Sequence, residues 1–231
     1  MFETIVRFFQ EGGLFMYPIA VVLVLGVAIS LERYIYLSAA KRTNRKAFDQ
    51  LLPLIKRQDY RGALRMTNES NAPISSIIGS GISRLLNKQP RDEIEYAMEE
   101  GLMDVLPRLE KRTQYLATLA NVATLLGLLG TIIGLIDAFS AVANADPSEK
   151  AALLSQSISV AMNTTAFGLI SAIPLLLLHS VLQTKTNEIV DSFEMAGVKL
   201  MNVITEKSTT GHAPAAGVSG SAIPPSAVPA R

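Results

Sequence analysis

Three long stretches of the chain contain no charged residue. They cover residues 12–31, 113–136 and 151–184, which are about 20, 24 and 34 residues long. A helix needs about 20 apolar residues to cross the hydrocarbon core of a bilayer. The pattern therefore predicts an all-α membrane protein with three transmembrane helices, at residues 12–38, 113–144 and 151–184. The alternative is a set of buried helices in a soluble core, but a soluble chain of this length rarely holds three such runs.

The polar segments also show helical periodicity. Apolar residues recur at helical spacing over residues 39–112, which predicts a helical domain outside the membrane. The breaks expected in it are Pro53, Asn71, Pro73 and Pro90. From Arg91 the pattern continues into the second span without a stop signal, so one long helix is predicted, with Pro107 placed to kink it. The third span is likewise expected to extend into a polar helix over residues 185–207.

The distribution of basic residues predicts the orientation of the chain in the membrane. Residues 39–112 contain 14 Lys or Arg, whereas residues 1–11 and the link at 145–150 contain one each. Cytoplasmic loops carry the excess of Lys and Arg in membrane proteins. We therefore expect residues 39–112 and the C-terminal part in the cytoplasm, with residues 1–11 and 145–150 on the periplasmic side.

The last part of the chain differs in composition. Residues 208–231 are a mixture of Pro, Gly, Ala and Ser with few large apolar side chains. Such a segment cannot bury enough apolar surface to offset the entropy lost on ordering. A disordered tail is predicted there.

Small and hydroxyl-bearing residues recur inside the second and third runs. On the second run they are Ala120, Thr124, Gly127, Thr131, Gly134 and Ala138, and on the third they are Ala161, Thr165, Gly168 and Ala172. Steps of three and four keep each set on one face of its helix. Small residues let membrane helices approach closely. The residues predicted to pack the helices together are Gly127, Gly130, Gly134, Gly168, Ala161 and Ala172.

The hydroxyl groups in these stripes lie at matching depths. Thr131 is about 13 residues, or roughly 20 Å, from the outer end of the second span, and Thr165 is about 14 residues, or roughly 21 Å, from that of the third. The two helices run in opposite directions, so both hydroxyls are expected level with each other. Asn163 and Thr164 lie at nearly the same height. The predicted lining of an ion pathway is Thr131, Thr165, Asn163, Thr164 and Thr124.

A packing role alone stays open as the alternative. A threonine hydroxyl can be satisfied by the carbonyl one turn back in its own helix. A non-conducting oligomeric scaffold would use the same small residues only for assembly.

The composition narrows the function further. The chain has no cysteine, which excludes disulfides, thiolate metal sites and thiol catalysis. No phosphate-binding glycine loop or metal-ligand cluster is evident and the two histidines are isolated, so neither an enzyme nor a metal site is expected. A net charge of +1 without a basic patch gives no sign of nucleic-acid binding.

No carboxylate or lysine lies at the depth of the hydroxyls. Asp137 is nearer the outer side, and His179 falls near the cytoplasmic end of the third span. A proton relay normally needs an ionisable group within the bilayer. If ions cross here, another subunit is expected to supply the titrating residue.

Three segments carry a resemblance to a known family. They are "ANVATLLGLLGTIIGLIDAF" at 120–139, "ISVAMNTTAFGLISAIP" at 158–174 and "LERYIYL" at 31–37. The chain resembles the MotA/TolQ/ExbB proton channel family, and its three spans with a large first cytoplasmic loop resemble the TolQ/ExbB branch. By this resemblance the pair Glu32–Arg33 marks the cytoplasmic membrane boundary.

The resemblance implies a function and an assembly. Members are ion-channel (stator-type) subunits that form a homopentamer in the bacterial inner membrane, in contact with lipid, around a single-span partner of the ExbD, TolR or MotB kind. The partner's membrane aspartate carries the ion, and ion flow drives mechanical work or transport at the cell envelope. Thr131 and Thr165 match the polar threonines of the family's second and third spans. No cofactor is implied besides the transported H⁺ or Na⁺.

Two positions depart from the family pattern. Relatives usually have a glutamate where this chain has Val160 and a proline where it has Thr124. The neutral oxygens that remain also suit Na⁺, so the ion is left open, with protons as the expectation.

Overall fold

The computed structural model describes residues 12–143 and 145–210, with side chains as far as residue 205. The helices in these residues are α2 (Met16–Lys56), α3 (Tyr60–Glu69), α4 (Pro73–Leu86), α5 (Arg91–Glu110), α6 (Thr113–Ala143) and α7 (Lys150–Thr210). The described part of the chain contains no strand. The predictions made for residues 1–11, 144 and 211–231 lie outside the described residues.

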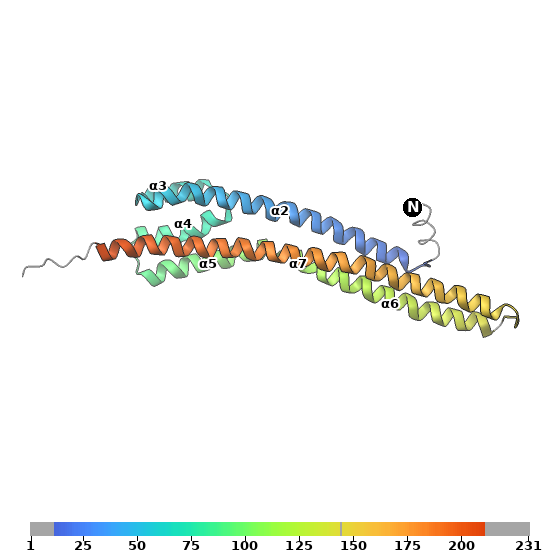
Figure 1. Cartoon of the computed structure of the whole chain (residues 1–231). Helices are drawn as coiled ribbons and strands as arrows, with labels where there is room; N and C mark the ends of the chain where they lie inside the picture. Colours follow the sequence, from blue (N-terminus) through green and yellow to red (C-terminus); the bar gives the residue numbers. More distant parts are fainter. Residues whose placement is uncertain (1–11, 144, 211–231) are drawn as a thin grey trace, which may run out of the picture.

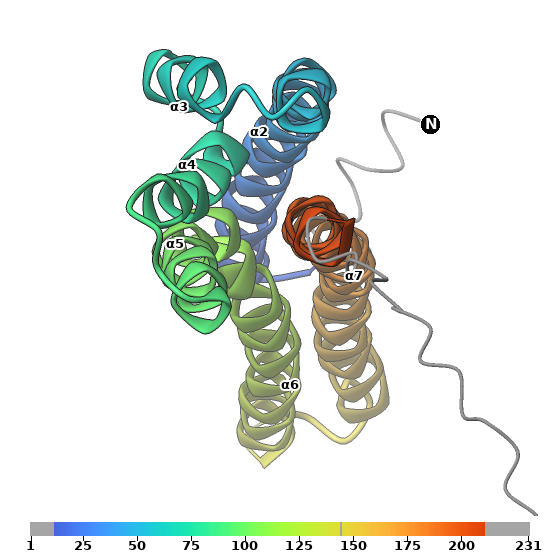
Figure 2. The same ribbon diagram turned by 90° about the vertical axis from the view of Figure 1, so that its left-hand side faces the viewer.

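The molecule is an elongated bundle built along α7 (Figure 1). α6 packs beside one end of α7, while α3, α4 and α5 gather around its other end and around the distal part of α2. Figure 2, which looks along the bundle, shows α2, α6 and α7 as separate columns with α3 to α5 on one side. We call α3, α4 and α5, together with residues 38–56 of α2 and 185–205 of α7, the polar bundle.

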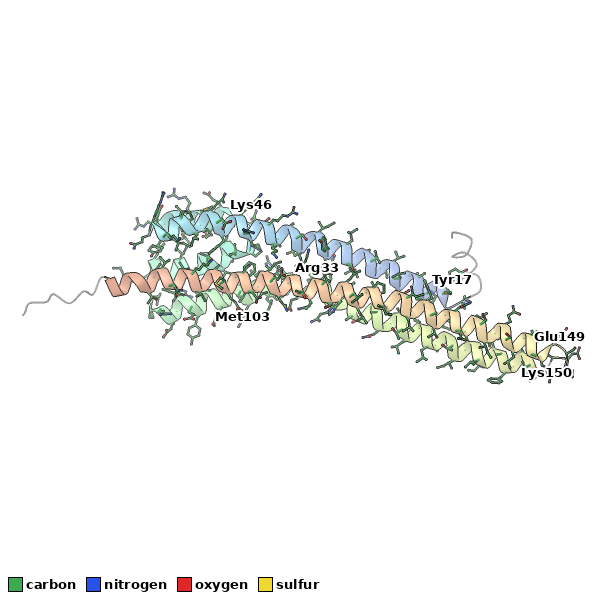
Figure 3. All side chains as sticks on the ribbon, in the orientation of Figure 1. Tyr17, Arg33, Lys46, Met103, Glu149 and Lys150 are labelled. Atoms are coloured by element: carbon green, nitrogen blue, oxygen red, sulfur yellow. The ribbon has the colours of Figure 1, made fainter. Side chains whose placement is uncertain are left out.

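Among the residues that the structure describes, three helical segments are long and apolar enough to cross a membrane, and they lie in α2, in α5 and α6 taken together (Arg91–Ala143), and in α7. Large apolar side chains project from their surfaces, among them Val24, Leu128 and Leu177, which are 66%, 53% and 64% exposed. Figure 3 shows side chains projecting outward along this part of the molecule, between the labelled Arg33 and Tyr17 and on towards Glu149. A soluble monomer rarely exposes such a continuous apolar surface. The prediction of an all-α protein with three apolar spans is confirmed.

The helix that contains the first span is longer than the proline pattern predicts. A break was expected at Pro53, but α2 begins at Met16 and continues through Pro53 to Lys56. Proline removes one backbone donor from the helix. Leu51 and Ile55, each 1% exposed, pack into the core on both sides of it, and their burial outweighs that lost hydrogen bond.

The long helix predicted from Arg91 into the second span is also interrupted. α5 ends at Glu110 and α6 begins at Thr113, so the prediction of one continuous helix is wrong. The break is not at Pro107, which lies inside α5, but at Arg112, whose φ is 66°. Next to this break, the carbonyl of Leu109 accepts a hydrogen bond from Arg33 of α2.

The C-terminal end of α7 lies beyond residue 207, where the helix was predicted to end. The helix passes Pro174 without a break and ends at Thr210. Residues 208–210, which were assigned to the tail, are therefore helical.

Two groups of buried side chains stabilise the fold. The larger lies in the polar bundle and includes Leu37, Ile78 and Phe193, which are at most 1% exposed. The smaller lies within the spans and consists of Ile19, Ala120, Ala123, Ala172 and Leu175. The spans thus touch through small residues and leave most of their large apolar side chains facing outward.

Candidate ion-pathway site

The site begins with the closest approach of α6 and α7, which occurs at two glycines. A Cβ atom built on Gly168 would lie 2.8 Å from the carbonyl oxygen of Ala123 and 3.0 Å from the Cα of Gly127. These distances leave no room for a side chain at Gly168. The two helix backbones therefore contact each other directly, as small residues allow in membranes.

The other small residues extend this contact along both helices. A Cβ on Gly134 would lie 2.9 Å from the Cβ of Ala161, and Gly130 faces the side chain of Thr164. Ala161 is 1% exposed and Ala172 is 2% exposed. We call this contact the α6–α7 seam. The residues predicted to pack the helices lie in it or, for Ala172, in the small core of the spans.

The hydroxyls of Thr131 and Thr165 meet in the seam. Their Oγ1 atoms form a hydrogen bond to each other. Each also lies within hydrogen-bond distance of the carbonyl oxygen of Gly127, at 3.1 Å for Thr131 and 2.8 Å for Thr165. This places three oxygens from two helices at one point, and both side chains are half-buried rather than sealed.

This arrangement has fewer protons than it has contacts. Two hydroxyl protons serve three oxygen–oxygen contacts, and each hydroxyl oxygen has two lone pairs. One contact lacks a proton at any moment, so the cluster can accept a hydrogen bond from an outside donor. A protonated acid or a small cation is the chemistry that fits such a group of neutral oxygens.

The structure does not bring the other three predicted residues to this point. The hydroxyl of Thr164, which is 2% exposed, lies 2.7 Å from the carbonyl of Gly12 and 2.9 Å from that of Val160. It faces the start of the described chain instead. Thr124 is exposed and donates to the Ala120 carbonyl in its own helix, and Asn163 is half-buried on α7. Their role in an ion pathway stays a prediction.

The predicted boundary pair, Glu32 and Arg33, makes contacts that sequence reasoning missed. Arg33 is only 3% exposed, and it donates to the carbonyl of Leu109 with its guanidinium 4.7 Å from the centre of the Tyr36 ring. Glu32 forms an ion pair with Arg112 at 3.1 Å. No local pattern could have indicated this, because Arg33 and Leu109 are 76 residues apart.

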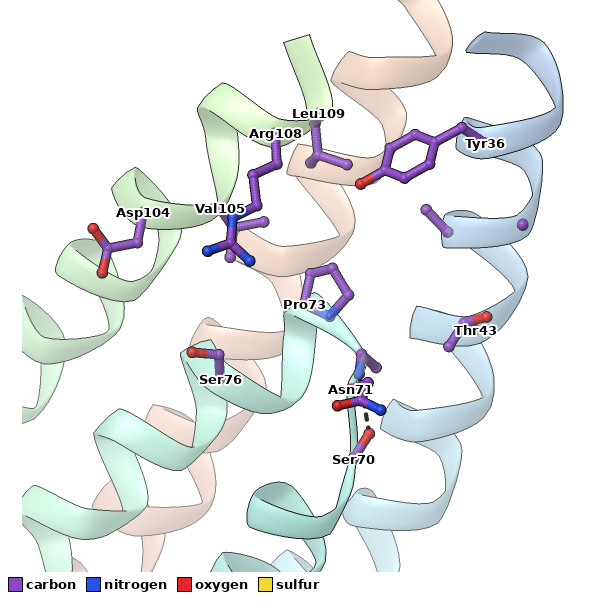
Figure 4. A pocket seen from close by; sticks show the side chains of 13 residues that line it. Tyr36, Thr43, Ser70, Asn71, Pro73, Ser76, Asp104, Val105, Arg108 and Leu109 are labelled. Atoms are coloured by element: carbon purple, nitrogen blue, oxygen red, sulfur yellow. Dashed lines mark hydrogen bonds between the residues drawn. The ribbon is translucent and has the colours of Figure 1, made fainter. Parts of the chain in front are cut away.

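A cavity of about 530 Å³ lies between α2, α5 and the segment before α4, on the side of the polar bundle next to the first span (Figure 4). Tyr36 and Thr43 line it from α2, Asp104 and Arg108 from α5, and the segment before α4 closes one side. No pattern in the sequence indicates this cavity. Within the residues that the structure describes, no three His, Asp or Glu side chains gather as a metal site would require.

Comparison with known proteins places the chain in a family. The model of the MotA/TolQ/ExbB proton channel family matches residues 69–195. The chain belongs to this family. An ExbB homolog of Methanothermobacter thermautotrophicus is 31% identical over 199 residues, which cover 84% of this chain and 68% of that protein. The biopolymer transport protein exbB1 of Vibrio cholerae is 27% identical over 74% of this chain and 76% of its own length.

The relatives include TolQ as well as ExbB proteins. The Tol-Pal system protein TolQ of Haemophilus influenzae is 31% identical over 121 residues, which cover 52% of this chain and 50% of TolQ. The part matched by the MotA/TolQ/ExbB model contains α6, the apolar portion of α7 and therefore both hydroxyls of the seam. The family resemblance found in the sequence is confirmed.

Proposed function

We propose that this chain is the channel-forming, stator-type subunit of an energy-transducing complex of the inner membrane, in which proton flow drives mechanical work or transport at the cell envelope. Membership of a proton channel family supports the general class. The observation that carries the specific proposal is the Thr131–Thr165 hydroxyl pair above the Gly127 carbonyl.

The proposed mechanism starts from the cost of charge in the membrane. A charged side chain at the centre of a bilayer costs about 3 kcal/mol or more. The chain has no Asp, Glu, Lys or Arg between residues 113 and 136 or between 151 and 184. We therefore propose that the ion arrives on another subunit, on the membrane aspartate of a single-span ExbD-, TolR- or MotB-like partner.

The hydroxyl pair offers a hydrogen-bond partner to that aspartate in both of its protonation states. When protonated, the carboxyl group donates a hydrogen bond to the proton-poor oxygen cluster, and when ionised it accepts one from either threonine hydroxyl. The ionised form gains more at this position, because elsewhere in the span it meets only apolar surroundings, where a charge is costly. Loss of the proton therefore biases the partner towards the hydroxyl pair, and uptake of a proton releases it. This is the step that converts ion flow into movement.

The proposed assembly is a homopentamer around the partner, embedded in lipid. The apolar faces that a single chain exposes on α2, α6 and α7 are available for neighbouring copies and for lipid. We place the polar bundle in the cytoplasm, because residues 39–112 hold 14 of the Lys and Arg residues. The N-terminus and the turn between α6 and α7 then face the periplasm.

The test replaces each hydroxyl by a methyl group of the same shape. Thr131→Val and Thr165→Val, co-reconstituted with the partner in liposomes, are expected to reduce proton flux about tenfold or more, because a hydrogen bond to a charged group contributes about 1.5 kcal/mol or more. The matched control is Thr184→Val on α7. Its hydroxyl makes the same kind of bond, to the Ser180 carbonyl at 3.0 Å, at the end of the apolar run.

Two outcomes would change the proposal. Flux that follows a Na⁺ gradient at constant pH would replace the proton by sodium as the ion. Unchanged flux of both ions in the two valine variants would exclude the pair from the path. The protein would then be the non-conducting scaffold that the α6–α7 seam also supports.

A further inference from the structure

The joint between α5 and α6 has a backbone conformation that its own sequence does not favour. Arg112, between the two helices, has φ of 66°. Residues with a Cβ atom rarely adopt this left-handed conformation, because the Cβ approaches the following carbonyl oxygen. The sequence "LEKRT" at 109–113 has no glycine, and Leu, Glu, Lys and Arg are good helix formers. Local preference therefore favours a continuous helix, and contacts from elsewhere must hold the break.

Arg33 of α2 provides the first of these contacts. In a continuous helix the carbonyl of Leu109 would accept the N–H of Thr113. At the break this carbonyl accepts the buried guanidinium of Arg33 instead. The positive charge lies at the C-terminal end of α5, where the helix dipole favours a cation. Arg33 thus takes the place of the missing backbone donor.

Glu32 provides the second contact. Its carboxylate pairs with the guanidinium of Arg112, the residue in the left-handed conformation, at 3.1 Å. Two adjacent residues of α2 therefore contact the joint on both sides. Arg33 binds the last turn of α5, and Glu32 binds Arg112, the residue before α6.

The bent joint leaves two buried polar atoms without a partner. They are Nε of Arg33 and Oγ1 of Thr113. In a continuous helix, the Thr113 hydroxyl would reach the Leu109 carbonyl one turn back. The bent form gives one guanidinium nitrogen of Arg33 a partner in the Leu109 carbonyl, while the straight form would satisfy Thr113 and relieve the backbone at Arg112. Each form therefore has favourable interactions that the other lacks, which is the condition for a two-state element.

We propose that the joint at Lys111–Arg112 has two states, a bent form and a continuous helix. The contacts of Glu32 and Arg33 hold it in the bent form. Without these two contacts, α5 and α6 join into one helix, and α5 turns relative to α2 and α7, which are continuous from the spans into the polar bundle. Glu32 and Arg33 are positioning residues in this scheme. The joint itself does not depend on the proposed function. Its consequence for ion flow does, because α6 carries Thr131.

The experiment measures a distance across the joint in the full chain. The sequence lacks cysteine, so spin labels at Tyr96→Cys on α5 and Leu125→Cys on α6, both exposed, are the only ones attached. The sample is reconstituted in lipid nanodiscs and diluted with unlabelled chain to suppress distances between copies. Across a straight helix, these positions are about 43 Å apart at 1.5 Å per residue. The parent is expected to give a shorter distance.

The variants separate the joint from general destabilisation. Arg33→Met keeps a long apolar side chain but no donor, and it should shift the main population towards about 43 Å. Glu32→Gln should shift a smaller fraction. Adding Arg112→Gly to Arg33→Met should restore the short distance, because glycine accepts the left-handed conformation and weakens the helix. Arg45→Gln, which alters an exposed side chain of α2 away from the joint, should change nothing.

The result that overturns the proposal is equally specific. It fails if Arg33→Met and Glu32→Gln both give the parent distribution, or if Arg112→Gly does not reverse the lengthening. If Arg33→Met does not fold, Glu32→Gln decides alone, because Glu32 is an exposed side chain whose loss leaves the core intact.

Discussion

The packing in the α6–α7 seam predicts that Gly→Ala substitutions at two positions of α7 differ strongly in their effect on the free energy of unfolding. Gly168→Ala places a methyl group 2.8 Å from the Ala123 carbonyl oxygen, about 0.6 Å short of the 3.4 Å at which ordinary contact begins. Gly197→Ala places it no closer than 3.8 Å to Met98, in ordinary contact. The first change must push the helices apart, whereas the second fits.

The magnitudes follow from these distances. Replacing a helical glycine by alanine gains about 0.5–1 kcal/mol in either position. Overpacking at Gly168 costs about 1–3 kcal/mol. Both variants gain this helix stabilisation, so it cancels between them. Gly168→Ala should therefore be about 1–3 kcal/mol less stable than Gly197→Ala. A separation of about 0.6 Å would also stretch the Thr165–Gly127 hydrogen bond from 2.8 Å towards the limit of such bonds, so ion flux should fall with it.

The assay is reversible unfolding in mixed detergent micelles, followed by far-ultraviolet circular dichroism, with both variants and the parent under the same conditions. Proton flux with the partner is measured in parallel. Equal stabilities within about 0.5 kcal/mol would show that the helices are not packed backbone to backbone at Gly168. The role of the seam in aligning the two hydroxyls would then be refuted as well.

Three further predictions concern the polar bundle and use the same unfolding measurement. Lys88, at the end of α4, has φ of 55°, so Lys88→Gly should raise the free energy of unfolding by about 1 kcal/mol, and no gain would mean that Lys88 is not left-handed. Asp59 accepts the Gly62 N–H at 2.9 Å as the N-cap of α3, so Asp59→Ala should cost about 1 kcal/mol while Asp59→Asn costs little. Ile78 is fully buried, so Ile78→Ala should cost about 2–5 kcal/mol and Ile78→Val about 1 kcal/mol; similar costs for both would contradict a tightly packed core there.

The candidate site was predictable only in part. The rise of a helix and the opposite directions of the two spans predict that Thr131 and Thr165 lie level, and the structure places them in contact. Thr164 lies at nearly the same height, but its hydroxyl faces Gly12. The height of a residue along a helix follows from its number in the sequence. Which side of the helix a distant segment such as Gly12 packs against does not.

Features that depend on the solvent and on local geometry follow from the residue pattern alone. Lipid requires long uncharged helices, so the three spans could be read from the gaps between charges. Helical periodicity put the small residues of α6 and α7 on facing stripes. Where helices continue or break depends instead on how the elements pack. α2 continues through Pro53, with Leu51 and Ile55 buried on both sides of it, and α5 ends at Glu110, where Arg33, far away in the sequence, donates to the Leu109 carbonyl. Such choices depend on contacts between distant residues, which outweigh the local preferences that a sequence pattern records.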